Sequence, residues 1–209
     1  INRGSLTPSP QPVTPAVRVA WAALALLLSA AAPAAEVAGV KLPERIQIGA
    51  DGPELVLNGA GVRVHLVFKV YVAALYLSAR MDDGEAILRD NRPSRLFMQM
   101  LRNLTVEQLA SSMNEALRET LTPEERLPLE PQLKQFNAIF DKVLEVRKGM
   151  QLAIDYLPQL GTVIRVNGEE AGRILGADFN QALLRVWIGD QPRDPKLKRA
   201  MLGIRPKEN

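Results

Sequence analysis

The chain has 209 residues, of which 23% are charged, and this length and composition suit one medium-sized globular domain. It has no cysteine, which excludes disulfides and thiolate metal ligands, and its single histidine, His65, argues against a multi-histidine metal site or a histidine-based catalytic triad. The net charge is +3, and it falls to +1 without residues 1–35, which hold two arginines and no acid. The remainder therefore lacks the basic surplus of a nucleic-acid-binding protein.

Residues 1–35 have the three parts of a secretory signal. A positive residue, Arg18, precedes the apolar run VAWAALALLLSAAA at 19–32, and small residues follow it. We expect cleavage after Ala34 or one residue later, which would leave one domain at 36–209 in the periplasm or outside the cell. A membrane anchor is the alternative, but a span needs about 20 strongly apolar residues and this run is shorter and rich in alanine.

The first half of the remaining chain predicts strands. Short strands are expected at 46–50 and 54–58, followed by a glycine-rich turn, Asn-Gly-Ala-Gly, at 58–61. Residues 62–77 (VRVHLVFKVYVAALYL) are dense in β-branched and aromatic residues, so we expect one long strand with a bend or bulge. The residues that would point to either face of this strand are mostly apolar, which predicts a central strand covered on both faces. Residues 95–102 predict another strand.

Helix signals begin at Thr105, which forms a capping box with Gln108. Pro131 suits the first turn of a second helix, whose apolar stripe extends to Val143 and which we expect to close at Gly149.

A hairpin and two more helices complete the pattern. Residues 150–156 alternate like a strand, and Asn167-Gly168 is a strong hairpin signal. A third helix is expected from a cap at Asp178 to Gly189, and a short last helix at 194–203. The basic residues of 193–207 are interpreted as a solvated face. This order predicts an α+β fold in which helices pack on one face of an antiparallel sheet.

Two segments resemble the chalcone isomerase family. LNGAGVRVHLVFKVYVAALYL at 57–77 resembles the segment in which a Gly-Ala-Gly motif leads to an arginine and a lysine-bearing strand ends in an aliphatic residue, Tyr and Leu. ALLRVWIGDQPRDPKLKRAML at 182–202 resembles the family's last helices. The resemblance covers most of 37–203 and implies an open β-sandwich, a large sheet wrapped by helices, with a ligand cleft between them. The family includes catalytic members, non-catalytic fatty-acid-binding members and exported bacterial relatives.

The resemblance also implies a site. Arg63 matches the arginine that polarises the substrate in the enzymes, and Tyr71 stands where they have a threonine. Their helix tyrosine and asparagine fall on Glu107 and Asn114, and the threonine of the penultimate helix falls on Val186. The candidate ligand-binding residues are therefore Arg63, Tyr71, Asn114, Val186 and Trp187, of which the first three would be catalytic if the protein is an enzyme.

The residues themselves allow a compatible interpretation. Arg63 and Tyr71 are eight positions apart, so they would share one face of a strand unless a bulge intervenes. An arginine that faces a covered layer needs an anion, and its planar fork suits a carboxylate. The alternatives are an exposed arginine at a strand start, a core tyrosine, a helix-surface Asn114, and a Glu107 that only favours the helix dipole.

We therefore expect an exported chalcone-isomerase-like protein that binds a small amphipathic carboxylate, with a fatty acid as the leading candidate, and that does not cyclise flavonoid precursors. No cofactor, metal or nucleic acid is expected. Two alternatives stay open. The protein could be an isomerase (an intramolecular lyase) acting on an unknown enone, or an envelope protein-interaction module.

Overall fold

The computed structural model describes residues 34–141 and 143–204. The predicted signal segment, 1–35, lies almost entirely outside the described residues, so its cleavage and the export that follows from it stay predictions. The described residues belong to one compact unit.

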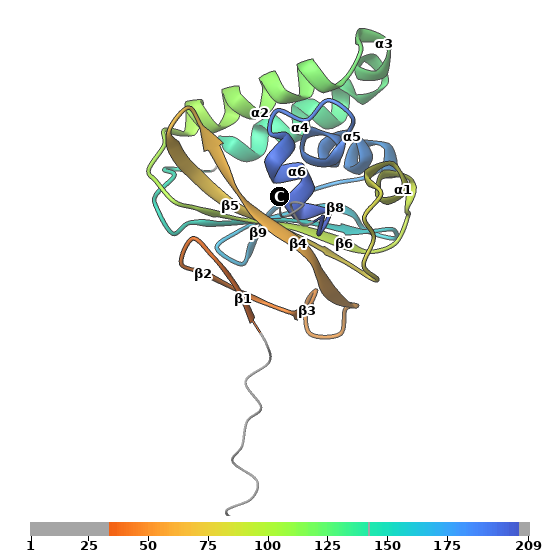
Figure 1. Cartoon of the computed structure of the whole chain (residues 1–209). Helices are drawn as coiled ribbons and strands as arrows, with labels where there is room; N and C mark the ends of the chain where they lie inside the picture. The colour runs from red at the N-terminus through yellow and green to blue at the C-terminus, as the bar shows by residue number, and fades with distance from the viewer. Residues whose placement is uncertain (1–33, 142, 205–209) are drawn as a thin grey trace, which may run out of the picture. The chain divides into compact units, whose positions relative to one another are not determined.

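One seven-stranded antiparallel sheet dominates this unit (Figure 1). Each strand pairs with the strands that precede and follow it in the sequence, so the sheet is a simple meander. Its strands are β3 (Arg45–Gln47), β4 (Glu54–His65), β5 (Phe68–Leu77), β6 (Ser94–Met100), β7 (Gln151–Leu157), β8 (Gly161–Val166) and β9 (Glu169–Ile174). The predicted large antiparallel sheet is confirmed.

Helices cover one face of the sheet, and a small hairpin covers part of the other (Figure 1). The helices are α1 (Gly84–Arg89), α2 (Val106–Thr120), α3 (Pro123–Arg126), the 3-10 helix η3 (Leu127–Leu129), α4 (Glu130–Phe140), α5 (Ala177–Ile188) and α6 (Pro195–Met201). The hairpin is β1 (Ala34–Val37) with β2 (Val40–Pro43). In the described part of the chain, no helix has the length and apolar character to span a membrane.

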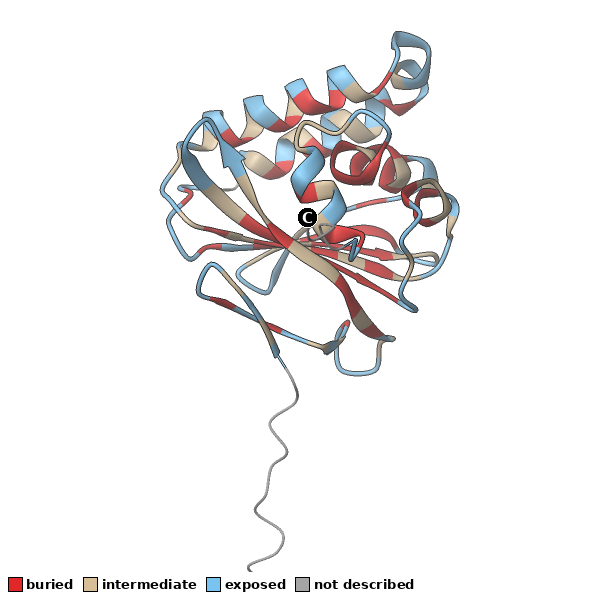
Figure 2. Ribbon diagram, viewed as in Figure 1, coloured by how far each residue is buried: buried red, intermediate tan, exposed pale blue. Residues whose placement is uncertain are grey.

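The strand β5 is covered on both faces, as its sequence predicts. Ala73 and Leu75 point into the core beneath the helices, whereas Val72 and Tyr76 point into a second core beneath β1 and β2. All four are almost fully buried (Figure 2). This explains why the strand is apolar at every position from Val72 to Leu77, because neither face of this part meets water.

The segment 58–77 is organised differently from the prediction. The expected long strand is two strands, since β4 ends at His65, β5 begins at Phe68, and Leu66 with Val67 forms the turn between them. Leu66 adopts a positive φ of 55°, a conformation that favours glycine or asparagine. The apolar turn therefore carries none of the usual turn residues, which is why its sequence did not reveal it.

The prediction of a glycine-rich turn at 58–61 is also wrong, because these residues lie inside β4 beside a register shift between Leu57 and Gly59. Their small size instead admits helix α6. A Cβ on Gly59 would stand 2.1 Å from the carbonyl oxygen of Ala200, and one on Gly61 would stand 2.7 Å from the Ala200 side chain. The glycines set how closely helix and sheet approach.

The helix ends follow the local signals with two exceptions. The capping box of Thr105 and Gln108 is present, and Asn167-Gly168 forms the β8–β9 turn with positive φ at both residues. The third helix, however, is capped by Gly176, and Asp178 lies in its first turn, where its carboxylate still faces the positive helix end. The second helix stops at Phe140, so Val143 packs against the core from the segment beyond it.

Candidate ligand-binding site

A cavity of about 740 Å³ opens between one end of the sheet and the helices α2, α5 and α6. This volume falls in the range of about 300–1,000 Å³ typical of small-molecule sites. The apolar part of its wall includes Leu109, Met113, Val186 and Leu197. Arginine and tyrosine side chains interrupt this apolar lining, so the cavity suits a molecule with an apolar body and a polar end.

Arg63 and Tyr71 both line this cavity. They are paired directly across β4 and β5, so they do share a face of the sheet as predicted. The reason differs from the prediction, because they lie on neighbouring strands and not on one strand. The apolar turn at 66–67 creates this pairing.

The charge of Arg63 is balanced within the chain. Its Nη1 donates to Asp194 Oδ2 at 3.2 Å and to the carbonyl oxygen of Val64 at 3.0 Å, and both charged side chains are less than one fifth exposed. The anion that the sequence analysis sought for Arg63 is therefore an aspartate 131 positions away. The contacts of Arg63 with other described residues use Nη1, which leaves the remaining N–H donors of its fork for a ligand.

Asp194 also begins helix α6. Its Oδ1 accepts from the backbone N–H groups of Lys196 at 3.1 Å and Leu197 at 3.0 Å, which confirms the predicted helix start. Burial acts to raise the pKa of the carboxyl, but the Leu197 N–H, Arg63 and the Val64 N–H together outweigh it and hold the pKa below its ordinary value. The aspartate is therefore ionised at neutral pH.

Tyr71 supplies a neutral hydroxyl group to the cavity. The indole N–H of Trp187 donates to the phenolic oxygen at 3.0 Å. Burial raises the pKa of Tyr71, although the hydrogen bond from Trp187 and the nearby Arg63 oppose this shift, so the phenol stays protonated at neutral pH. No acceptor for its proton lies within reach among residues 34–141 and 143–204, so the O–H can donate to a ligand.

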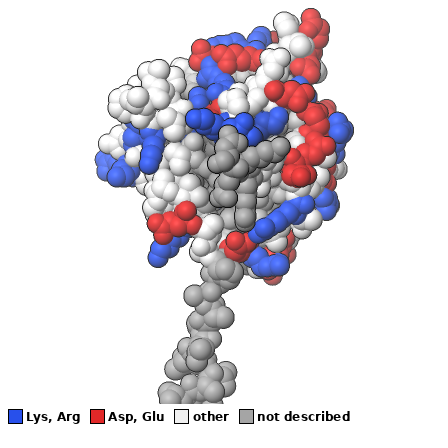
Figure 3. Space-filling model, in the orientation of Figure 1, with Lys and Arg blue, Asp and Glu red and all other residues white. Residues whose placement is uncertain are grey.

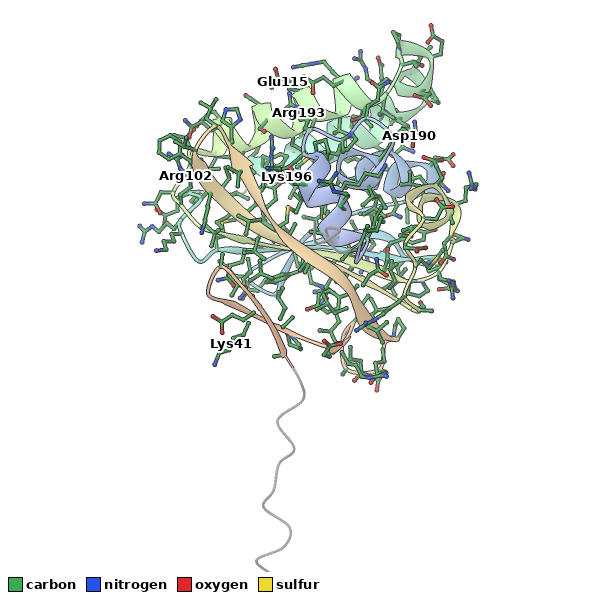
Figure 4. All side chains as sticks on the ribbon, in the orientation of Figure 1. Lys41, Arg102, Glu115, Asp190, Arg193 and Lys196 are labelled. Atoms are coloured by element: carbon green, nitrogen blue, oxygen red, sulfur yellow. The ribbon has the colours of Figure 1, made fainter. Side chains whose placement is uncertain are left out.

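Sequence reasoning missed Arg193, which it assigned to a solvated face. This residue lies in the loop between α5 and α6, lines the cavity, and is only 25% exposed. Its guanidinium binds Glu115 at 2.8 Å and Glu119 at 2.8 Å, so it fastens the loop to helix α2 (Figure 4). These glutamates raise its pKa above the ordinary value. No local signal could have identified it, because its partners are more than 70 positions away.

The remaining candidates separate into two groups. Val186 and Trp187 line the cavity, so a role in ligand binding stays a prediction for both. Asn114 is not part of the wall, and its side-chain amide donates to Asn137 Oδ1 at 2.7 Å, which links α2 to α4. Glu107 is exposed, and hydrogen bonds from its own backbone N–H and from Thr105 lower its pKa. This agrees with the alternative that Glu107 is an ordinary carboxylate in the first turn of a helix. Neither Asn114 nor Glu107 is placed to touch a ligand in this cavity.

The described residues contain no cluster of three or more histidine, cysteine, aspartate or glutamate side chains that could hold a metal ion. The cavity offers a ligand apolar contacts and the buried hydroxyl of Tyr71, together with arginines of which Arg63 and Arg193 are paired with the carboxylates of Asp194 and Glu115 in the same wall.

A meander sheet with helices on one face and a cavity between the two layers defines an α+β protein with the chalcone isomerase type of fold. The chain belongs to the chalcone isomerase-like family, whose sequence model matches residues 34–203. Among solved structures it is similar to a fatty-acid-binding protein of Arabidopsis thaliana, with a TM-score of 0.61 and 15% identity over 78% of this chain and 92% of the other. Comparison with curated protein sequences gives no significant match. The predicted family and fold are both confirmed.

Proposed function

We propose that this protein binds a small amphipathic carboxylate, with a fatty acid as the simplest candidate, in the cavity between the sheet and helices α2, α5 and α6. The observation that carries the proposal is the pairing of Arg63 and Tyr71 at the polar part of a mainly apolar cavity. The structural similarity to a plant fatty-acid-binding protein supports the same class of ligand.

The headgroup would bind between the free donors of Arg63 and the hydroxyl of Tyr71. A guanidinium fork holds a carboxylate through parallel hydrogen bonds, and a neutral phenol adds a third without repelling the anion. The acyl chain would then lie along Leu109, Met113 and Trp187. Asp194 keeps Arg63 in place and limits its net attraction for an anion, which favours reversible binding.

Mass spectrometry of lipid released from natively purified protein tests this proposal directly. Arg63→Ala should weaken binding of a fatty acid about 10- to 100-fold, because a charged hydrogen bond is worth about 1.5–3 kcal/mol. Arg63→Lys should recover only part of this loss, since a point charge lacks the fork. Binding of the matched fatty alcohol should hardly change, and equal weakening of acid and alcohol would contradict a carboxylate site.

We further propose that the protein acts in the periplasm or outside the cell after removal of residues 1–35. The support is the signal-like pattern of Arg18 and the apolar run at 19–32. N-terminal sequencing of exported material should begin at Ala35 or Glu36. An intact run at 19–32 in the membrane fraction would instead indicate an anchor.

An isomerase that acts on an enone is the second candidate. The convergence of Arg63 with the protonated phenol of Tyr71 favours it, because such a pair could polarise a carbonyl group. Against it, the family's tyrosine and threonine are replaced by Glu107, which is exposed, and by Val186, which has no hydroxyl. If the wild-type protein bound neither acid nor alcohol, a protein-interaction role would be favoured over both ligand-based functions.

A further inference from the structure

The turn between β4 and β5 exposes three consecutive apolar side chains, Leu66, Val67 and Phe68, which we call the hairpin tip. Leu66 is 82% exposed, Val67 83% and Phe68 54%. Large apolar side chains grouped at this level of exposure are unusual on a soluble surface and mark sites that meet another apolar phase. A tight turn has no folding reason to consist of such residues, because asparagine and glycine would form it at lower cost.

Two cations, Lys69 and Arg102, adjoin the hairpin tip. The guanidinium carbon of Arg102 lies 4.9 Å from the centre of the Phe68 ring, and Lys69 follows Phe68 in the sequence. Neither cation forms an ion pair with any residue that the structure describes, in contrast to Arg63 and Arg193 nearby.

Acidic residues are missing from this part of the sequence, since the chain has none between Glu54 and Asp82. Figure 3 shows the tip as an uncharged bulge with basic side chains beneath it, and Figure 4 places Arg102 beside the hairpin. The combination of an apolar tip with unpaired cations is what a surface of anionic lipid attracts.

The hairpin tip also adjoins the ligand cavity. His65, the last residue of β4, and Arg102 both line that cavity, and Arg63 lies two positions before His65. A lipid surface that received the tip would therefore lie at the mouth of the cavity, so an amphipathic ligand would have a short path between the two.

We propose that the hairpin tip inserts into the interfacial region of an anionic lipid bilayer, with Lys69 and Arg102 bound to the headgroups. Three protruding side chains are far fewer than a stable protein interface of about 800 Å² per partner requires. Insertion into a bilayer interface, by contrast, needs few apolar side chains when cations assist them. The proposal concerns where the protein docks, and it stands whether or not the cavity holds a fatty acid.

The absence of cysteine from the chain makes a site-specific test possible. Val67→Cys, labelled with an environment-sensitive fluorophore, reports insertion at the tip alone. The matched control is Leu175→Cys, because Leu175 is also apolar and 68% exposed but follows β9 at the opposite end of the sheet. Full-length labelled proteins are mixed with vesicles of phosphatidylcholine alone or with one third phosphatidylglycerol, with and without brominated acyl chains.

The label at position 67 should brighten, shift to the blue and be quenched by brominated lipid in anionic vesicles, whereas the label at position 175 should not respond. Arg102→Gln and Lys69→Gln should each raise the lipid concentration needed for half-maximal response about fivefold, as expected for one cation near an anionic surface. Added salt should have the same effect on the unsubstituted protein.

Two results would overturn the proposal. The first is no response at position 67, which would leave a protein partner or a second copy of the chain as the occupant of the tip. The second is an equal response at positions 67 and 175, which would mean that the chain associates with lipid through another segment. Because each label reports its own position, an apolar segment elsewhere in the full chain cannot imitate insertion of the tip.

Discussion

Asp194 has two roles, because the same carboxylate begins helix α6 and neutralises Arg63. Asp194→Asn separates them, since asparagine caps a helix about as well as aspartate but carries no charge. We expect this variant to bind a fatty acid roughly threefold to tenfold more tightly, because Arg63 keeps its charge and loses a competitor. Titration calorimetry with acid and matched alcohol measures this, and an unchanged acid affinity would count against Arg63 as the anchor.

The same substitution has a pH signature. The pKa of Asp194 in the folded protein lies below its ordinary value of 3.8, so its ionised form contributes stability above that pH. This contribution is lost as the pH falls through the lowered folded-state pKa. The stability difference between wild type and Asp194→Asn should therefore be constant near neutrality. Below about pH 4 the wild type should lose stability relative to Asp194→Asn, as followed by thermal unfolding.

The hydroxyl of Tyr71 gives a second prediction at this scale. Tyr71→Phe keeps the buried ring but leaves the indole N–H of Trp187 without its acceptor, which should cost about 1–3 kcal/mol of stability. Trp187→Phe in the same background removes the stranded donor, so a double-mutant cycle on chemical denaturation should show strong coupling between the two positions. Additive effects would mean that the hydrogen bond contributes little to folding.

At the scale of elements, two glycines of strand β4 allow helix α6 to approach it closely. Gly59 faces the backbone of α6, whereas Gly61 faces the side chain of Ala200. Alanine at either position should therefore destabilise the protein by about 1–3 kcal/mol through overpacking.

The two glycines differ in whether a second change can rescue them. Ala200→Gly costs about 1 kcal/mol in a helix but removes the nearest group that Gly61→Ala would meet, which leaves only the flexible Leu197 Cδ1 at 3.1 Å. It cannot relieve Gly59→Ala, which meets the carbonyl oxygens of Ala200 and Met201. Chemical denaturation of the three single variants and the two pairs should thus show rescue for position 61 only, and rescue at both would mean that α6 shifts easily along the strand.

At the scale of the whole molecule, chalcone cyclisation should be negligible. Of the family's polar set, only Arg63 is both present and in the cavity, because Asn114 is bonded to Asn137 outside it. The decay of hydroxychalcone absorbance should match the uncatalysed rate and should not respond to Arg63→Ala. A fast rate that depends on Arg63 would favour the isomerase over the binding protein.

The sequence by itself determined the local features of this protein. The capping box at Thr105, the hairpin at Asn167-Gly168 and the helix start at Asp194 each depend on groups within three or four positions of one another, so short motifs encode them. Its hydrophobic periodicity also indicated a sheet with helices on one face and a central strand buried on both. The resemblance in 57–77 and 182–202 supplied the family.

The resemblance named four residues that line the cavity, Arg63, Tyr71, Val186 and Trp187, but only the tertiary structure decided how they are arranged and paired. The pairs Arg63–Asp194 and Tyr71–Trp187 join residues 131 and 116 positions apart, and the cavity that they line exists only once α5 and α6 pack on the sheet. Even the pairing of Arg63 with Tyr71 depends on a turn at Leu66, which no turn residue marks. Strand register and helix packing set these contacts through many weak interactions across the whole core, so no short segment of the sequence contains them.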